Sequence, residues 1–166
     1  TGASYNVATD GGSYDFPGLP AGTYTLSVVD ANTCVSNGTT ASITQPSAAL
    51  SLSAAGEALN CFGDADGNIT GTVSGGTAPY SVTLVGTGLS IAVAVDGGSY
   101  DFQGLSAGSY TVEVNDANGT TGGCFASASA SITQPSAALS LSAAGDALDC
   151  FGDADGNITG TVSGGT

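Results

Sequence analysis

Hydrophobic and polar residues alternate along this chain in short runs, which predicts strands. Residues 110–114, Tyr-Thr-Val-Glu-Val, alternate apolar and polar side chains, and residues 24–28, Tyr-Thr-Leu-Ser-Val, repeat the pattern. A period of two is typical of a strand with one buried face. Glycine and β-branched residues recur too densely for stable helices, and helix caps are missing. The chain is therefore predicted to be all-β.

Turn-forming residues separate the strand-like runs. Gly-Gly-Thr-Ala-Pro at 75–79 and Asn118-Gly119 are turn signals of this kind. Seven strands are predicted between residues 47 and 135, at 49–55, 68–74, 80–86, 89–95, 99–103, 109–115 and 125–134. Seven short strands in about 90 residues indicate an immunoglobulin-like β-sandwich.

The whole pattern repeats along the chain. Gly-Gly-Ser-Tyr-Asp-Phe occurs at 11–16 and 97–102, 86 residues apart, and Ile-Thr-Gln-Pro-Ser-Ala-Ala-Leu occurs at 43–50 and 132–139, 89 residues apart. Residues 47–77 and 136–166 differ at only two of 31 positions. Such self-similarity is the signature of a tandem array. The predicted fold is thus a series of immunoglobulin-like β-sandwich repeats, each of about 86–90 residues.

The repeat defines three parts of the chain. Residues 47–135 form one complete repeat, residues 1–46 the C-terminal half of the preceding one, and residues 136–166 the N-terminal part of the next. We expect a longer parent protein from this register. Pro46 and Pro135 fall between repeats, where a short rigid linker would hold neighbouring sandwiches in line.

A shared tyrosine motif fits the sandwich. Leu-x-Ala-Gly-x-Tyr occurs at 19–24 and 105–110 and places Tyr24 and Tyr110 near the start of the sixth strand. A tyrosine corner lies there in immunoglobulin-like domains. The alternative is that both tyrosines are simply core aromatics.

Composition narrows the possible functions. Lys, Arg and His are absent and 14 acidic residues give a net charge of −14, so nucleic acid and anionic membranes are not expected partners. No apolar run approaches the roughly 20 residues of a membrane span. Without His, Lys or Arg, only a carboxylate pair such as Asp64 with Asp66, or Asp96 with Asp101, could be imagined to catalyse. These acids lie in recurrent turns, so we predict that the chain is not an enzyme.

One acidic turn is a candidate calcium site. Asp64, Asp66 and Asn68 place oxygen donors at alternate positions, as at the start of an EF-hand loop, but the closing glutamate is missing. The second copy supplies Asp153, Asp155 and Asn157. A cation would relieve the repulsion between the carboxylates. A polar Asx turn between strands is the alternative interpretation.

Four segments fit the N-glycosylation sequon, and they begin at Asn37, Asn68, Asn118 and Asn157. Chance sequons are expected in a chain so rich in Asn, Ser and Thr. A glycan at any of them would add solubility and protection from proteases.

The four cysteines recur in register, which favours disulfides and an oxidising compartment. Pairing Cys61 with Cys124 is the simplest possibility, and it would contribute about 4 kcal/mol in the chain-entropy view. In an ordinary sandwich, however, the loops that carry them lie at opposite ends. Pairing between neighbouring repeats is the alternative, and Cys34 and Cys150 are expected to have partners outside residues 1–166.

Several motifs occur in an order that resembles a known family. They are Cys-Phe-Gly at 61–63, Asp-Gly-Asn-Ile at 66–69, Gly-Gly-Thr-Ala-Pro-Tyr at 75–80, Leu-x-Ala-Gly-x-Tyr-Thr-Val at 105–112, Asp-Ala-Asn-Gly at 116–119, Cys124 and Ile-Thr-Gln-Pro at 132–135. This order resembles the SprB-type repeat of giant Bacteroidota surface proteins, which include gliding adhesins. The chain departs from the family in lacking a Trp in its third strand and in having no basic residue. The resemblance implies a cell-surface location, type IX secretion and a role in adhesion or surface movement.

Two functions of different classes follow. The first is a structural repeat of an extracellular filament or adhesin stalk. Its expected partners are the neighbouring repeats, further copies of the chain in a fibre, and surface glycans. The second is a calcium-dependent carbohydrate-binding accessory module of a secreted protein. The absence of Trp disfavours the second, because sugar sites usually expose an aromatic platform.

Overall fold

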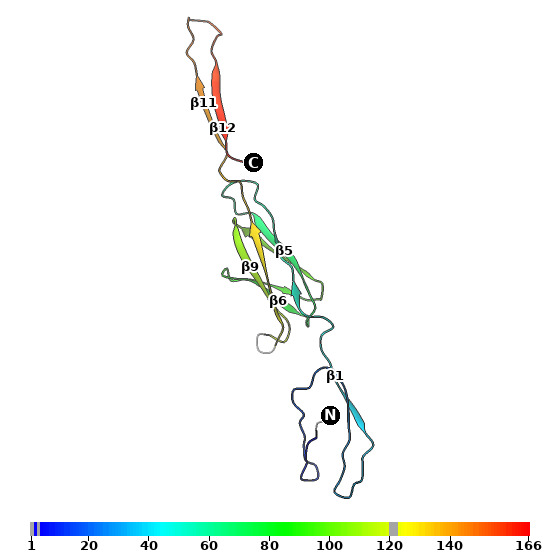
Figure 1. Ribbon diagram of the computed structural model, residues 1–166. Coiled ribbons are helices and arrows are strands. Elements are labelled where there is room, and N and C mark those ends of the chain that lie inside the picture. Colours follow the sequence, from blue (N-terminus) through cyan, green and yellow to red (C-terminus); the bar gives the residue numbers. More distant parts are fainter. Residues whose placement is uncertain (1, 3, 120–122) are drawn as a thin grey trace. The chain divides into compact units, whose positions relative to one another are not determined.

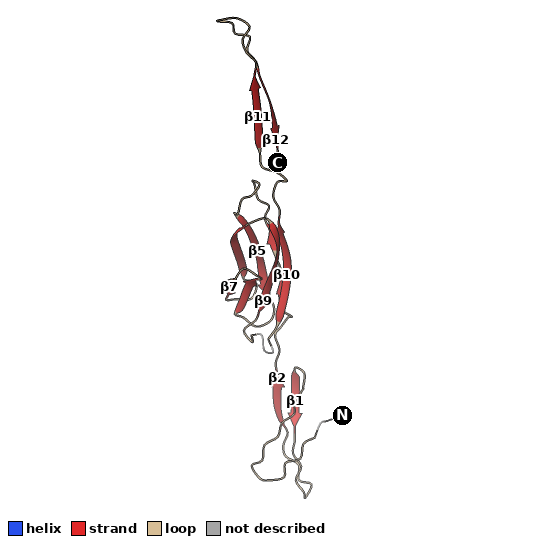
Figure 2. Ribbon diagram, turned by 90° about the vertical axis from the view of Figure 1, so that its left-hand side faces the viewer, coloured by secondary structure: helices blue, strands red, loops and turns tan. Residues whose placement is uncertain are grey.

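The computed structural model describes residues 2, 4–119 and 123–166, and these residues form strands, turns and loops without a helix (Figures 1 and 2). It follows that none of the described residues belongs to a helix long and apolar enough to cross a membrane. The chain divides into two compact units, Thr1–Pro46 and Ser47–Thr166.

The repeat over residues 47–135 is a sandwich of two antiparallel sheets. One sheet has the order β10-β9-β6-β7, built from Phe125–Ile132, Gly108–Asn115, Tyr80–Leu84 and Leu89–Val93. In the other sheet, β5 (Gly67–Ser74) is central, with β8 (Ser99–Leu105) on one side and β3 (Ser51–Leu52) and β4 (Ala55–Gly56) on the other. The predicted all-β, immunoglobulin-like sandwich is confirmed.

The alternation read from the sequence corresponds to burial. On β9, Val112 and Val114 are fully buried whereas Thr111 is exposed. The buried apolar residues all lie within this repeat: Leu59, Ile69, Val73, Tyr80, Val82, Leu84, Val93, Tyr100, Phe102, Leu105, Val112, Val114, Ala130 and Ile132. Residues 47–135 thus contain a complete core of their own.

The first predicted strand, at 49–55, is interrupted. β3 and β4 pair with β5 in one continuous register, but Ser53 and Ala54 between them are not in ladder conformation. The carbonyl of Ser53 accepts a hydrogen bond from the Tyr100 hydroxyl at 2.5 Å, and its Oγ accepts one from the Thr72 amide at 2.9 Å. These side-chain hydrogen bonds replace part of the backbone ladder and split the strand.

The remaining strands form two hairpins. β1 (Gly22–Leu26) pairs with β2 (Thr39–Ile43), and β11 (Ser140–Gly145) pairs with β12 (Ile158–Ser163). Their apolar residues are far more exposed than the equivalents in the complete repeat: Ile158 is 79% exposed, whereas Ile69 is 0% exposed. The partial repeats form their local pairings but do not bury a core.

Two tyrosines decide between the alternatives left open by the sequence. Tyr110 donates a hydrogen bond to the Ser106 carbonyl at 2.9 Å, and Tyr24 donates one to the Pro20 carbonyl at 2.7 Å. A hydroxyl that returns to the backbone four residues upstream at this strand is a tyrosine corner. The motif is therefore a structural element of both copies.

Candidate functional site

The predicted calcium turn lies between β4 and β5. The Gly63 amide, in a backbone conformation with φ of 85°, donates to the Gln134 side chain at 2.8 Å, and the Asn68 carbonyl accepts from the Glu57 amide at 3.1 Å. Asn68 lies in β5, whereas Asp64 and Asp66 are exposed. Hydrogen bonds within the protein thus fix both ends of the turn.

Calcium binding at this turn stays a prediction. In the part of the chain that the structure describes, no three His, Cys, Asp or Glu side chains cluster closely enough to hold a metal ion. Asp64, Asp66 and Asn68, like Asp153, Asp155 and Asn157 in the second copy, would need carbonyl or water ligands to complete a calcium shell. Unfolding midpoints with and without a chelator would test this prediction.

A second acidic turn is built around Asp116, the only buried charged residue among those described. Its Oδ1 accepts from the amides of Asn118 and Cys124, both at 3.1 Å. Its Oδ2 accepts from the Thr77 amide and from Nδ2 of Asn118, both at 3.2 Å. Burial by itself raises the pKa of Asp116, but these hydrogen bonds outweigh it and hold the pKa below its usual value. The carboxylate therefore ties the loop before β10 to the turn before β6.

The same turn forms in the first copy. Oδ1 of Asp30 accepts from the amides of Asn32 at 2.9 Å and Cys34 at 2.8 Å, as Asp116 does from its own neighbours. The loop from Asp30 to Cys34 is four residues shorter than the loop from Asp116 to Cys124. An aspartate that bonds the amide two residues later is an Asx turn, so Asp-Ala-Asn closes the loop regardless of its length.

The cysteines lie at opposite ends of the repeat. Leu59, two residues before Cys61, donates its amide to the Thr133 carbonyl at 2.7 Å, just after β10 ends. Cys124 immediately precedes β10. The eight residues of β10 rise about 26 Å. A disulfide needs the two Cα atoms within about 7 Å.

The predicted pair of Cys61 with Cys124 inside one repeat is therefore wrong, because the length of a strand separates the two residues. None of the four cysteines, Cys34 and Cys150 included, is paired with another cysteine within residues 1–166. Partners for Cys34 and Cys150 outside residues 1–166 stay a prediction.

The four sequon asparagines occupy different environments. Asn37, Asn118 and Asn157 are exposed, and Asn68 is half-buried on β5. Nδ2 of Asn118 donates to Oδ2 of Asp116 at 3.2 Å, so a glycan on this nitrogen would have to form beside that hydrogen bond. Thr120, which completes the sequon at Asn118, lies outside the described residues. Glycosylation of all four stays a prediction.

The carboxylates considered for catalysis take part in local hydrogen bonds. Oδ1 of Asp96 accepts from the Gly75 amide at 2.8 Å, and Oδ2 of Asp101 accepts from Nε2 of Gln103 at 2.5 Å. Asp64 and Asp66 are exposed in their turn. These hydrogen bonds join Asp96 to the turn at Gly75 and Asp101 to a neighbour on its own strand.

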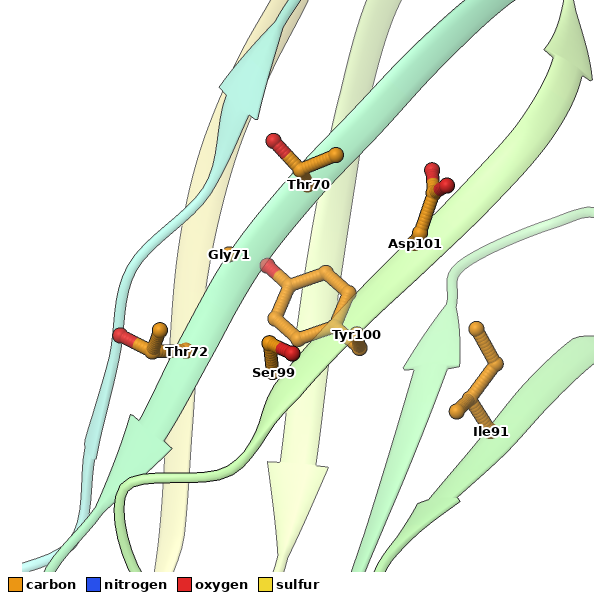
Figure 3. A pocket seen from close by; sticks show the side chains of 7 residues that line it. All are labelled: Thr70, Gly71, Thr72, Ile91, Ser99, Tyr100 and Asp101. Atoms are coloured by element: carbon orange, nitrogen blue, oxygen red, sulfur yellow. The ribbon is translucent and has the colours of Figure 1, made fainter.

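An open groove of about 560 Å³ lies where β5 and β8 approach β7 (Figure 3). Its lining residues are Thr70, Gly71, Thr72, Ile91, Ser99, Tyr100 and Asp101. The Tyr100 ring extends toward Gly71 in Figure 3, and its hydroxyl donates a hydrogen bond to the Ser53 carbonyl. Burial raises the pKa of Tyr100 to about 12, so the hydroxyl stays a proton donor. The groove offers hydroxyls and one carboxylate but no exposed aromatic platform.

The sandwich, and the segment after it that restates residues 47–77 with two changes in 31 positions, define a tandem immunoglobulin-like repeat. The SprB repeat family model matches residues 59–84, the stretch from the acidic turn through β5 to the end of β6. The resemblance to SprB-type repeats is thereby confirmed for this stretch. SprB repeats are structural repeats found in cell-surface proteins, including adhesins. No curated protein matches the chain.

Proposed function

We propose that this chain is a segment of the stalk of an extracellular cell-surface adhesin or filament, in which the repeats act as spacers. One observation carries the proposal: residues 47–135 hold a complete core, and the segment after them restates residues 47–77 with two changes in 31 positions. A unit that folds alone and recurs nearly unchanged builds length.

The groove on β5 and β8 supports the same function. Its only aromatic residue is Tyr100, whose ring is buried and whose hydroxyl is bonded to Ser53. A carbohydrate-binding module would need a more enclosed site with an exposed ring. Weak contacts repeated along a stalk, including self-association into fibres or contacts with surface glycans, fit an array better because repetition multiplies them.

A length series tests the spacer role. Proteins of one, two and three copies of residues 47–135 are compared by small-angle X-ray scattering. The largest dimension is expected to grow by a constant increment of at least about 26 Å per copy, the rise of an eight-residue strand. Growth with about the 0.38 power of chain length, as in a single globule, would refute the stalk.

A glycan array probed with the single repeat tests the alternative. Reproducible binding of a sugar that is lost on adding a chelator would favour the calcium-dependent carbohydrate module. Absence of binding is the result expected for a spacer.

A further inference from the structure

The free cysteines mark the two ends at which one repeat meets the next. We define the leading end of the repeat as the end that holds Ala48, Thr77 and Cys124, and the trailing end as the end that holds Cys61 and Gln134. At the leading end, the Gly76 amide donates to the Ala48 carbonyl at 2.9 Å, and the Ala117 amide donates to the Thr77 carbonyl at 2.9 Å. At the trailing end, the Gly63 amide donates to the Gln134 side chain.

The connection between repeats brings a trailing end to a leading end. Only Pro135 and Ser136 separate Gln134 from Ala137, and three residues of extended chain span at most about 11 Å. The Gly165 amide donates to the Ala137 carbonyl at 3.0 Å, the counterpart of the bond between Gly76 and Ala48. The next leading end therefore begins within about 11 Å of Gln134.

Contacts within Ser47–Thr166 already show this approach. Cys61 lines a small hollow together with Gly165 and Thr166, the counterparts of Gly76 and Thr77. In the complete repeat, the Thr77 amide donates to Asp116, whose other oxygen accepts from the Cys124 amide. Cys61 at the trailing end thus lies beside the turn at Gly165 and Thr166. In a complete repeat, the equivalent turn is joined through Asp116 to Cys124 at the leading end.

The residues next to the cysteines support a covered junction. Phe62 follows Cys61 and is 47% exposed, and Phe125 follows Cys124 and is 57% exposed. Phe62 lines the same hollow as Cys61, together with Leu139, so the trailing end already lies against the start of the following repeat.

We propose that a disulfide joins each repeat to the next, between Cys61 of one repeat and the residue equivalent to Cys124 in the repeat that follows. The two thiols lose two protons and two electrons to a disulfide-bearing oxidant, which is reduced to two thiols. Cys34 takes the leading role and Cys150 the trailing role in their own repeats. The bridge rests on the tandem arrangement of the proposed stalk, and it adds a covalent cross-link beside the linker at Pro135 and Ser136.

The test uses a protein in which residues 47–135 are followed directly by a second copy of residues 47–135, since this part of the chain contains a complete core. In the junction variant, only Cys61 of the first copy and Cys124 of the second are kept, and the other cysteines become Ser. The matched control keeps the opposite two, Cys124 of the first copy and Cys61 of the second. Both are oxidised with glutathione disulfide, alkylated and weighed by mass spectrometry.

The junction variant is expected to close an internal disulfide and take up no alkylating agent, whereas the control keeps two reactive groups as thiols or glutathione adducts. Closure of the control to the same extent, or an open junction pair, overturns the proposal. Circular dichroism confirms that both variants are folded. The unsubstituted two-repeat protein provides an independent count, because two of its four cysteines should remain outside the internal disulfide, as thiols or glutathione adducts. The scattering series does not depend on thiols, so failure of the bridge and failure of the stalk are distinguishable.

Discussion

Replacing Gly71 by alanine adds one methyl group at the most crowded point of β5. A Cβ there would clash with the Ser53 carbonyl oxygen and would lie 2.6 Å from the hydroxyl oxygen and 2.7 Å from Cζ of Tyr100. The Ser53 oxygen belongs to the backbone, so it cannot rotate away as a side chain would. The Gly71→Ala variant must therefore shift β3 and β4 or displace the Tyr100 ring.

The cost follows from the contacts that are lost. Overpacking of a core costs about 1–3 kcal/mol, and loss of the hydrogen bond from Tyr100 to Ser53 costs about 1 kcal/mol more. Removing a glycine from the unfolded chain returns about 0.4–1 kcal/mol. We expect the free energy of unfolding to fall by about 2 kcal/mol and the midpoint temperature by about 8–16 °C in a domain of this size.

Urea unfolding of residues 47–135, followed by tyrosine fluorescence, measures this change. Gly108→Ala is the matched control, because a Cβ at Gly108 meets only the Tyr110 ring, at 3.5 Å or more. That variant should stay within about 0.5 kcal/mol of the parent, as a change without a buried clash does. Equal stability of the two variants would refute the idea that Tyr100 and Ser53 close over Gly71.

Three further outcomes are expected. Tyr110→Phe removes the bond to Ser106 and should lower the free energy of unfolding by about 1 kcal/mol in chemical denaturation; no change would mean that the tyrosine corner acts through its ring alone. The pKa of Asp116 is lower in the folded protein, so its contribution is present above its unfolded value of about 3.9 and is lost as the pH falls through the folded pKa. Asp116→Asn should therefore flatten the loss of stability toward acid pH, whereas Glu57→Gln, at an exposed position, should leave it unchanged. The urea-unfolded chain should resist trypsin and be cut by chymotrypsin, because it contains no Lys or Arg but 11 Tyr and Phe residues; cleavage by pure trypsin would contradict this.

The strands were largely predictable, because alternation of apolar and polar residues reports directly which face is buried. The exception is the first strand. Ser140–Gly145, which restates residues 51–56, forms a continuous β11, whereas residues 51–56 divide into β3 and β4. In the complete repeat the Tyr100 hydroxyl donates a hydrogen bond to the carbonyl of Ser53, which lies 47 residues away in the sequence. Local pattern cannot reveal a hydrogen bond that comes from the other side of a sheet.

The candidate site residues were predictable as turns but not as partners. The Asp-Ala-Asn motif signals an Asx turn, and the structure adds that Asp116 also binds the Thr77 amide. The role of Gln134 in holding Gly63 had no local signal, because 71 residues separate them. The sequence favoured pairing Cys61 with Cys124, although the loops that carry them were expected at opposite ends, and only the position of β10 showed how far apart they lie.

The sequence by itself determined the all-β class, the repeat and its register, and the exclusion of chemistry that needs a basic side chain, because periodicity and composition are local properties. Tertiary structure decided which apolar residues are buried, where the first strand breaks and which ends of the repeat carry the thiols. Ile69 and Ile158 have nearly identical neighbours along the chain, yet one is fully buried and the other largely exposed. Burial depends on the facing sheet, which is formed by β6, β7, β9 and β10. These strands follow β5 in the sequence and pack over β5 of the same repeat.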